Sequence, residues 1–145
     1  MKSITVPLCL ALCLPLVLTS SAGADSVTNW NANASKAALA ACIAPGNDPL
    51  HESRMYAMMH IAIHDALNAI DKRSRPYAFD ARVERPTSAD AAVAAAAHDV
   101  LVPVISQLPF PPECVSAGID SVEADYAAAL AAVPSGRAKE RKSVV

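Results

Sequence analysis

The sequence predicts an all-α protein in which several antiparallel helices form a partial helical bundle behind an N-terminal export signal. Two observations carry this prediction: apolar residues recur at three- and four-residue steps through long segments, and no segment alternates apolar and polar residues as a strand would. The 145 residues are 53% hydrophobic but only 4% aromatic, because alanine supplies much of the apolar content. Alanine favours helix and buries little area, so we expect one small domain with a thin core.

The N-terminal segment has the three parts of a secretory signal. Lys2 provides a positive charge, residues 4–18 form an uncharged apolar run, and Ala22, Gly23 and Ala24 form a small-residue cleavage site before Asp25. The run is shorter than the roughly 20 residues that a membrane-spanning helix needs. We therefore expect residues 1–24 to be a signal peptide and residues 25–145 to be a periplasmic or secreted helical segment, with no membrane attachment after cleavage.

The first half of the mature chain contains two predicted helices. A short one is expected from Ser35, as its cap, to about Ile43, where Pro45 and Gly46 stop it. Asp48 and Pro49 then start a helix over residues 49–71, with an acidic N-cap and proline at the first helical position. Its expected buried stripe comprises Met55, Met58, Met59, Ala62, Ile63, Ala66, Leu67 and Ile70, and a neighbouring stripe holds His60, His64 and Asn68.

The second half begins with a charged, proline-containing connection over residues 71–87. A helix capped by Ser88 or Thr87 is expected over residues 89–108, and Pro103 should kink or divide it. The next helix is expected over residues 113–133, between the proline-rich segment 109–112 and the break at residues 134–136. Residues 137–145 are typical of the start of a further helix. The expected buried side of the helix over 113–133 comprises Val115, Ile119, Val122, Tyr126 and Leu130.

Two cysteines, Cys42 and Cys114, remain once the signal peptide is removed. In an oxidising compartment they could form a disulfide, or they could be two buried thiols in helices that never meet. Neither belongs to a Cys-x-x-Cys pair, which argues against zinc or redox chemistry. Spacing alone leaves the two alternatives open.

Few residues have the pattern of a catalytic or metal site. His60 and His64 are four residues apart on one helix, but Ile61 stands where a zinc protease would have glutamate, and no third ligand is marked among the remaining histidines. Asp65 is expected to cap a neighbouring segment or to pair with Arg54 or Lys72. The formal net charge of −2 gives no basic footprint for a nucleic acid. We assign no catalytic, cofactor-binding or metal residue.

One stretch resembles a known family. Trp30 and Asn31, the segment from Arg54 to Ile70 (RMYAMMHIAIHDALNAI) and the tripeptide Arg75-Pro76-Tyr77 resemble the N-terminal region of bacterial secreted proteins related to vanadium-dependent haloperoxidases. These proteins belong to the type 2 phosphatidic acid phosphatase superfamily. The resemblance implies a helical bundle that binds phosphate or vanadate through lysine, arginine and histidine side chains.

The oxyanion-binding motifs of that family do not map onto this sequence. The lysine expected before each Arg-Pro pair falls on Asn68 or Ala78, and Pro134-Ser135-Gly136 continues with Arg137 where the family has histidine. The resemblance therefore predicts an exported scaffold fragment that lacks the active-site half and is catalytically inactive alone. Vanadate or phosphate is expected only in a longer family member. Whether the chain is an enzyme stays open.

Two further expectations concern its partners. The fragment interpretation implies missing C-terminal helices or a homo-oligomer that completes the core. The alternative is a small secreted or periplasmic helical interaction module. An orphaned scaffold should expose a large apolar stripe, whereas a self-contained module should cover it.

Overall fold

The computed structural model describes residues 25–83 and 88–134, and within these ranges every regular element is a helix. The prediction of an all-α fold is confirmed. The four helices are α1 (Ser26–Ala40), α2 (Pro49–Ile70), α3 (Ala89–Ser106) and α4 (Pro112–Ala132). The expected signal peptide, the alternative cap Thr87 and the helix expected after residue 137 lie outside the part of the chain that is described.

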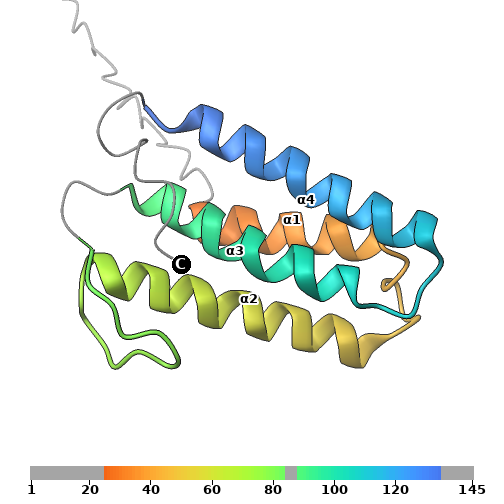
Figure 1. Cartoon of the computed structure of the whole chain (residues 1–145), viewed down its shortest axis with the longest axis horizontal. Helices are drawn as coiled ribbons and strands as arrows, with labels where there is room; N and C mark the ends of the chain where they lie inside the picture. Colours follow the sequence, from red (N-terminus) through yellow and green to blue (C-terminus); the bar gives the residue numbers. More distant parts are fainter. Residues whose placement is uncertain (1–24, 84–87, 135–145) are drawn as a thin grey trace, which may run out of the picture.

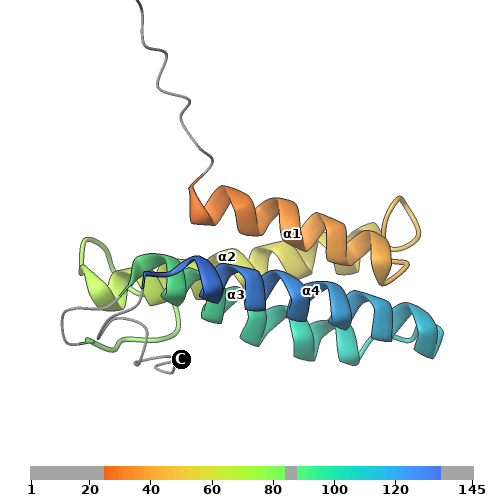
Figure 2. The same ribbon diagram turned by 90° about the horizontal axis from the view of Figure 1, so that it is seen from above.

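Successive helices run antiparallel, as expected of a small bundle (Figure 1). α2, α3 and α4 form a layer in which α3 lies in the centre and packs against both neighbours, and α1 lies on one face of this layer against α4 and α3 (Figure 2). α2 and α4 are therefore the two edges of the layer. Among the described helices, none packs against the outer long face of α2 or of α4.

The start of α1 was predicted wrongly. The helix begins at Ser26, nine residues before the predicted cap Ser35, because the Asp25 carboxylate accepts the N–H of Thr28 at 2.8 Å and caps the helix there. Trp30, Ala34, Ala37 and Ala38 are its buried residues, a three- and four-residue repeat hidden within a polar segment. The helix ends at Ala40 rather than Ile43, and Cys42 follows with a left-handed backbone, φ 61°.

The start of α2 is confirmed. Asp48 accepts the N–H of His51 at 3.1 Å, and Pro49 occupies the first turn. Met55, Met59, Ile63 and Ala66 are buried as predicted, but Met58 is 38% exposed. Met58 lies about 100° around the helix from Met59, which turns it away from α3. The buried set also contains two polar residues, Asp65 and Asn68, which the apolar stripe did not predict.

α3 is the central helix of the layer. Ser88 caps it by accepting the N–H of Ala91 at 3.2 Å. The helix continues through the exposed Pro103 to Ser106, so the proline does not divide it. Residues 93–97 are buried without interruption. Among the helices of the described ranges, α3 alone is long and apolar enough to cross a membrane by length and composition. A helix surrounded by other helices needs the same composition.

Small side chains bring the helices close together. The core combines a few large buried residues, such as Trp30, Met59 and Leu101, with many buried alanines. Gly118 of α4 packs so closely on the end of α1 that a Cβ atom there would lie 2.6 Å from the Cβ of Ala41. The glycine therefore allows α4 to contact the end of α1 closely.

Candidate functional site: the loop that follows α2

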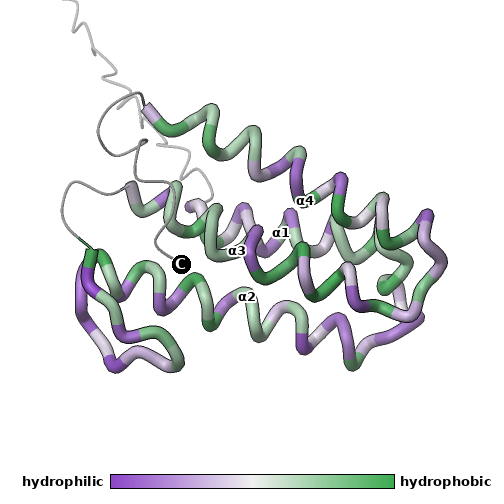
Figure 3. Tube along the Cα trace, viewed as in Figure 1, coloured by the Kyte–Doolittle hydropathy of each residue, from purple (hydrophilic) through white to green (hydrophobic). Residues whose placement is uncertain are grey.

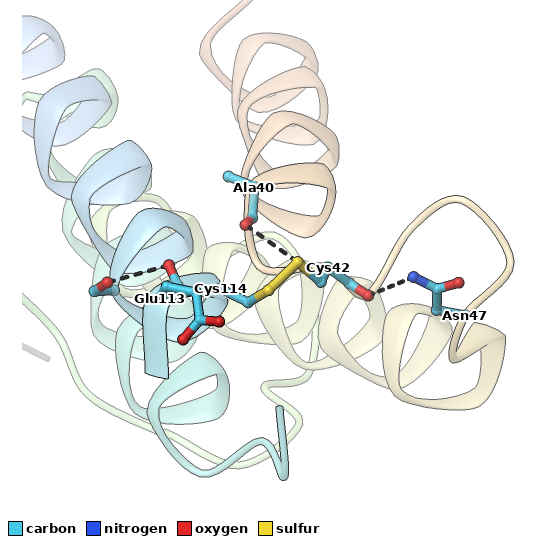
Figure 4. The surroundings of a disulfide bond; sticks show 6 residues. Ala40, Cys42, Asn47, Glu113 and Cys114 are labelled. Atoms are coloured by element: carbon cyan, nitrogen blue, oxygen red, sulfur yellow. Dashed lines mark hydrogen bonds between the residues drawn. A yellow bond between two sulfur atoms is a disulfide. The ribbon is translucent and has the colours of Figure 1, made fainter. Parts of the chain in front are cut away.

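A disulfide joins Cys42, just after α1, to Cys114 in the first turn of α4 (Figure 4). The two Cα atoms are 5.6 Å apart, and the bridge closes a sequence separation of 72 residues. The Asn47 side chain donates to the carbonyl oxygen of Cys42 at 2.9 Å, which ties the following turn to the bridge. Of the two alternatives that the sequence left open, the structure has the bonded pair. Its surroundings are those of a structural cross-link.

The main polar feature of the fold is at the opposite end of the bundle, where the loop of residues 71–83 folds back over α2. Asp65 is only 3% exposed, and its carboxylate accepts three backbone N–H groups of this loop. Tyr77 donates at 2.8 Å, Ala78 at 2.7 Å and Phe79 at 2.8 Å. Asp65 thus caps a neighbouring segment, one of its two predicted roles, and pairs with neither Arg54 nor Lys72.

Asn68, one turn further along α2, holds the first part of the same loop. Its side-chain oxygen accepts the backbone N–H groups of Arg73 at 3.1 Å and Ser74 at 3.0 Å, and also the hydroxyl of Ser74 at 3.2 Å. At the far end, the N–H of Val83 donates to the carbonyl of Ala69 at 3.1 Å. Both buried polar side chains of the described core, Asp65 and Asn68, therefore form hydrogen bonds with the same loop.

These contacts determine the charge state of Asp65. Burial alone would raise the pKa of this carboxyl, but the N–H donors of Tyr77, Ala78 and Phe79 favour the carboxylate and hold its pKa below the usual aspartate value. Asp65 is therefore ionised at neutral pH. A loop that satisfies a buried carboxylate with three donors is fixed in one conformation, because releasing it would leave a buried charge without partners.

The loop presents aromatic and cationic side chains outward. Tyr77 is 77% exposed and Phe79 is 40% exposed. Lys72 pairs with Asp80 at 2.7 Å and Arg73 pairs with Asp71 at 2.7 Å, so four of its charges are neutralised within the loop. Arg75 has no carboxylate within ion-pair distance among residues 25–83 and 88–134. Figure 3 shows the mostly hydrophilic character of this loop.

His60 and His64 face the loop without forming a metal site. An open pocket of about 480 Å³ is lined by His60, Ile61, His64, Arg75, Pro76 and Tyr77. The His64 ring lies 3.3 Å from the Ser74 hydroxyl, and the His60 ring lies 3.0 Å from the side-chain oxygen of Asn31 in α1. No three histidine, cysteine, aspartate or glutamate side chains gather as a metal site would require, within the residues that the structure places.

A second histidine cluster joins α3 to α4. One ring nitrogen of His98 lies 2.8 Å from Asp99 and the other lies 3.1 Å from Glu123, and the ring stacks on Tyr126 with centroids 4.2 Å apart. Burial would lower the pKa of His98, but the two carboxylates outweigh it and raise the pKa above the usual histidine value. The cluster links two helices by charge and stacking, a structural arrangement.

Comparisons with known proteins assign no family to this geometry. No family model matches the chain, and neither the curated proteins nor the solved structures contain a match. The sequence predicted that Asp65 caps a neighbouring segment or forms an ion pair, but it did not predict that this segment is residues 77–79 or that Asn68 holds the same loop. The available signal was a pair of polar residues three positions apart on the last turns of an apolar helix, followed directly by a loop rich in backbone donors.

Proposed function

We propose that this chain is a helical interaction module that binds a protein partner through the loop of residues 71–83. One observation carries the proposal: Asp65 fixes this loop through three backbone hydrogen bonds while Tyr77 and Arg75 point to solvent. A loop already fixed in one conformation binds without the entropic cost of ordering it. Together with tryptophan, tyrosine and arginine are the side chains enriched at the energetic centres of protein interfaces.

The charge of the loop indicates the class of partner. Its aspartates are paired within the loop, whereas Arg75 keeps an unpaired charge next to the exposed Tyr77 ring and the apolar Ile61. A surface of this kind favours a partner that combines carboxylates with small or apolar side chains. Among the described residues, the large exposed apolar side chains outside this loop are few, namely Leu39, Leu50 and Met58, which is consistent with a module rather than an orphaned scaffold.

The experiment is affinity capture from the secreted or periplasmic fraction of the source cells, using the chain as purified after export. Capture of a defined protein should be lost with Tyr77→Ala and with Arg75→Glu. Leu39→Ala is the matched control, since Leu39 is also exposed but lies on α1. Equal capture by all four proteins, or none by the wild type, would exclude recognition through this loop.

The second candidate is the scaffold of a larger phosphatase- or haloperoxidase-like bundle. A specific observation favours it: two of the three parts of the resemblance form one structural unit, because Asp65 of the Arg54–Ile70 segment accepts the backbone N–H of Tyr77 in the Arg75-Pro76-Tyr77 tripeptide. DNA downstream of the Val145 codon, read in all frames, tests this role. It should encode the lysine and Arg-Pro motif and then Pro-Ser-Gly-His, and unrelated sequence in every frame would reject it.

Under both candidate functions the protein is exported to the periplasm or the medium. The support is the sequence pattern of residues 1–24 together with a disulfide geometry at Cys42 and Cys114, since disulfides persist in oxidising compartments. Mass spectrometry of the exported protein should give Asp25 as the first residue. A mature protein that retains residues 1–24 would contradict the signal peptide.

A further inference from the structure

The outward faces of the two edge helices carry different charged residues. Segment 88–134 contains no lysine or arginine, and its acidic residues are Asp90, Asp99, Glu113, Asp120, Glu123 and Asp125. The lysines and arginines of the described ranges all lie in residues 25–83. Residues 25–83 hold as many acidic as basic residues, so the contrast lies in which charges face outward on α2 and α4, which lie on opposite sides of α3 (Figure 1).

The outer side of α2 has a regular pattern. We define the cationic face as Leu50, Arg54, Ala57, Ile61 and His64 of α2 together with Arg75 and Tyr77 of the loop. The α2 members recur at steps of four and three residues and lie opposite the buried Met59. Leu50 is 80% exposed, and Arg54, Ala57 and His64 are also exposed. Leu50 and Tyr77 are large exposed side chains on this face, and burying them against a partner would be favourable.

The outer side of α4 has the complementary pattern. We define the acidic face as Glu113, Ala117, Asp120, Ala124, Ala127 and Ala131, which recur at the same steps and lie opposite the buried Val122. All six are exposed. The carboxylates lie in the first half of the helix and the second half of this face is alanine alone. Alanine leaves room for a neighbouring helix to approach closely.

We infer that copies of this chain associate head to tail, with the acidic face of α4 in one copy docked on the cationic face of α2 in the next. The inference rests on the proposed function and names its partner as a second copy. α2 and α4 run in the same direction within one copy (Figure 1), so a copy displaced sideways sets the two faces parallel. The layer of helices then continues from copy to copy.

Parallel docking matches the two ends of each face. Glu113 and Asp120, at the start of α4, come next to Arg54 near the start of α2. The alanine end of α4 comes next to Ile61 and the rigid loop, where Ala124 and Ala127 leave space for the Tyr77 ring. The opposite orientation would set the carboxylates of α4 beside Tyr77 and leave Arg54 facing alanines.

An interface between two different faces has a distinct consequence. Unlike a symmetric dimer interface, it leaves one free face at each end of every complex, so association continues into longer chains or closes into a ring. Because opposite charges drive it, added salt should weaken it.

The experiment is sedimentation velocity of the full chain as purified after export, over a wide concentration range at low and high salt. The wild type should form a concentration-dependent series of oligomers that high salt dissociates. Arg54→Glu with Arg75→Glu, or Glu113→Arg with Asp120→Arg, should each reduce association at least about tenfold. All four changes in one chain exchange the two charges and should restore it. Asp90→Lys is the matched control, because Asp90 is an exposed carboxylate outside the acidic face.

Several results would overturn the inference. A wild type that stays monomeric at every concentration in low salt would do so, as would association that both double reversals leave intact. If the wild type is monomeric but associates after removal of residues 135–145, then that basic segment of the same chain occupies the acidic face in place of a second copy. A monomer that still captures another protein through Tyr77 would refute self-association and leave the proposed function intact. Association or capture that is unchanged by substitution of Arg75 and Tyr77 would refute the proposed function.

Discussion

The two ends of the bundle are held together by different physical means. At one end, Cys42 and Cys114 form a covalent bridge, and Gly118 lies against Ala41 where no larger side chain fits. At the other end, no disulfide joins the loop of residues 71–83 to the described helices. Two buried polar side chains, Asp65 and Asn68, hold it by hydrogen bonds to its backbone.

The difference separates stabilising the fold from presenting a surface. At the disulfide end, the bridge and the Gly118–Ala41 contact join α1 to α4. At the loop end, the contacts use backbone N–H groups, which leaves Tyr77, Phe79 and Arg75 free for other contacts. A loop fixed through its backbone can change its outward side chains without losing its conformation. We therefore expect the disulfide to contribute mainly to stability and the loop to contribute mainly to binding.

The largest expected effect is at the disulfide end. Cys42→Ala with Cys114→Ala should lower the free energy of unfolding by about 2–4 kcal/mol, because the bridge restricts the unfolded chain over a long loop. Urea denaturation measures this loss. The wild type in reductant is the control and should unfold at the same urea concentration as the double variant. An unchanged midpoint would show that the bridge does not stabilise the fold.

The next effect tests the loop end. Asp65→Asn should lower the free energy of unfolding by about 1–3 kcal/mol, because the uncharged side chain is a weaker acceptor for three buried donors. Asp71→Asn is the matched control, since it removes only an exposed ion pair to Arg73 and should cost less than about 1 kcal/mol. Equal losses in the two variants would mean that the Asp65 contacts are no stronger than surface pairs.

Gly118→Ala tests the close contact at the disulfide end, because the sign of the change in the free energy of unfolding shows whether a Cβ atom fits there. Helix propensity alone predicts stabilisation of about 0.5–1 kcal/mol. The neighbouring Cβ and backbone of Ala41 cannot move aside easily, so we expect a net loss of about 1–3 kcal/mol. Ala117→Gly, at the exposed neighbouring position, calibrates the propensity effect. A more stable Gly118→Ala protein would show that the helices have room to separate.

The smallest expected effect is the pH dependence of the α3–α4 contact. The folded pKa of His98 is raised above its unfolded value of 6.5, so its stabilising contribution is complete below pH 6.5 and is lost as the pH rises through the folded pKa. Since both carboxylates are about half exposed, we expect no more than about 1 kcal/mol. Thermal melts across this range should show the fall in wild type and not in His98→Gln. A parallel fall in both would assign it to other groups.

The sequence predicted the elements whose signals are local. Asp48 with Pro49, and Ser88 before an alanine-rich segment, mark the starts of α2 and α3 because a cap acts on residues within one turn. The same reasoning failed for α1, where Asp25 begins the helix but polar residues between Trp30 and Ala34 hide the apolar repeat. A repeat supported only by tryptophan and alanine gives a weak periodic signal.

The loop contacts could not be predicted in the same way. Asp65 was expected to cap something, but its three donors lie 12 to 14 residues away, and no local rule fixes which segment returns to a helix face. Pairing of Cys42 with Cys114 likewise depends on α1 and α4 meeting, a tertiary property. In both cases the residue types indicated the interaction and the fold decided the partner.

Hydrogen exchange of three backbone amides tests the central claim, that Asp65 holds the loop as a rigid binding surface. The N–H groups of Tyr77, Ala78 and Phe79 lie in an exposed loop, yet all three donate to one buried carboxylate. At neutral pH they should exchange as slowly as amides within α2 in the wild type, and rapidly in Asp65→Asn. Exchange of these amides in the wild type at the rate of an unstructured peptide would contradict the claim.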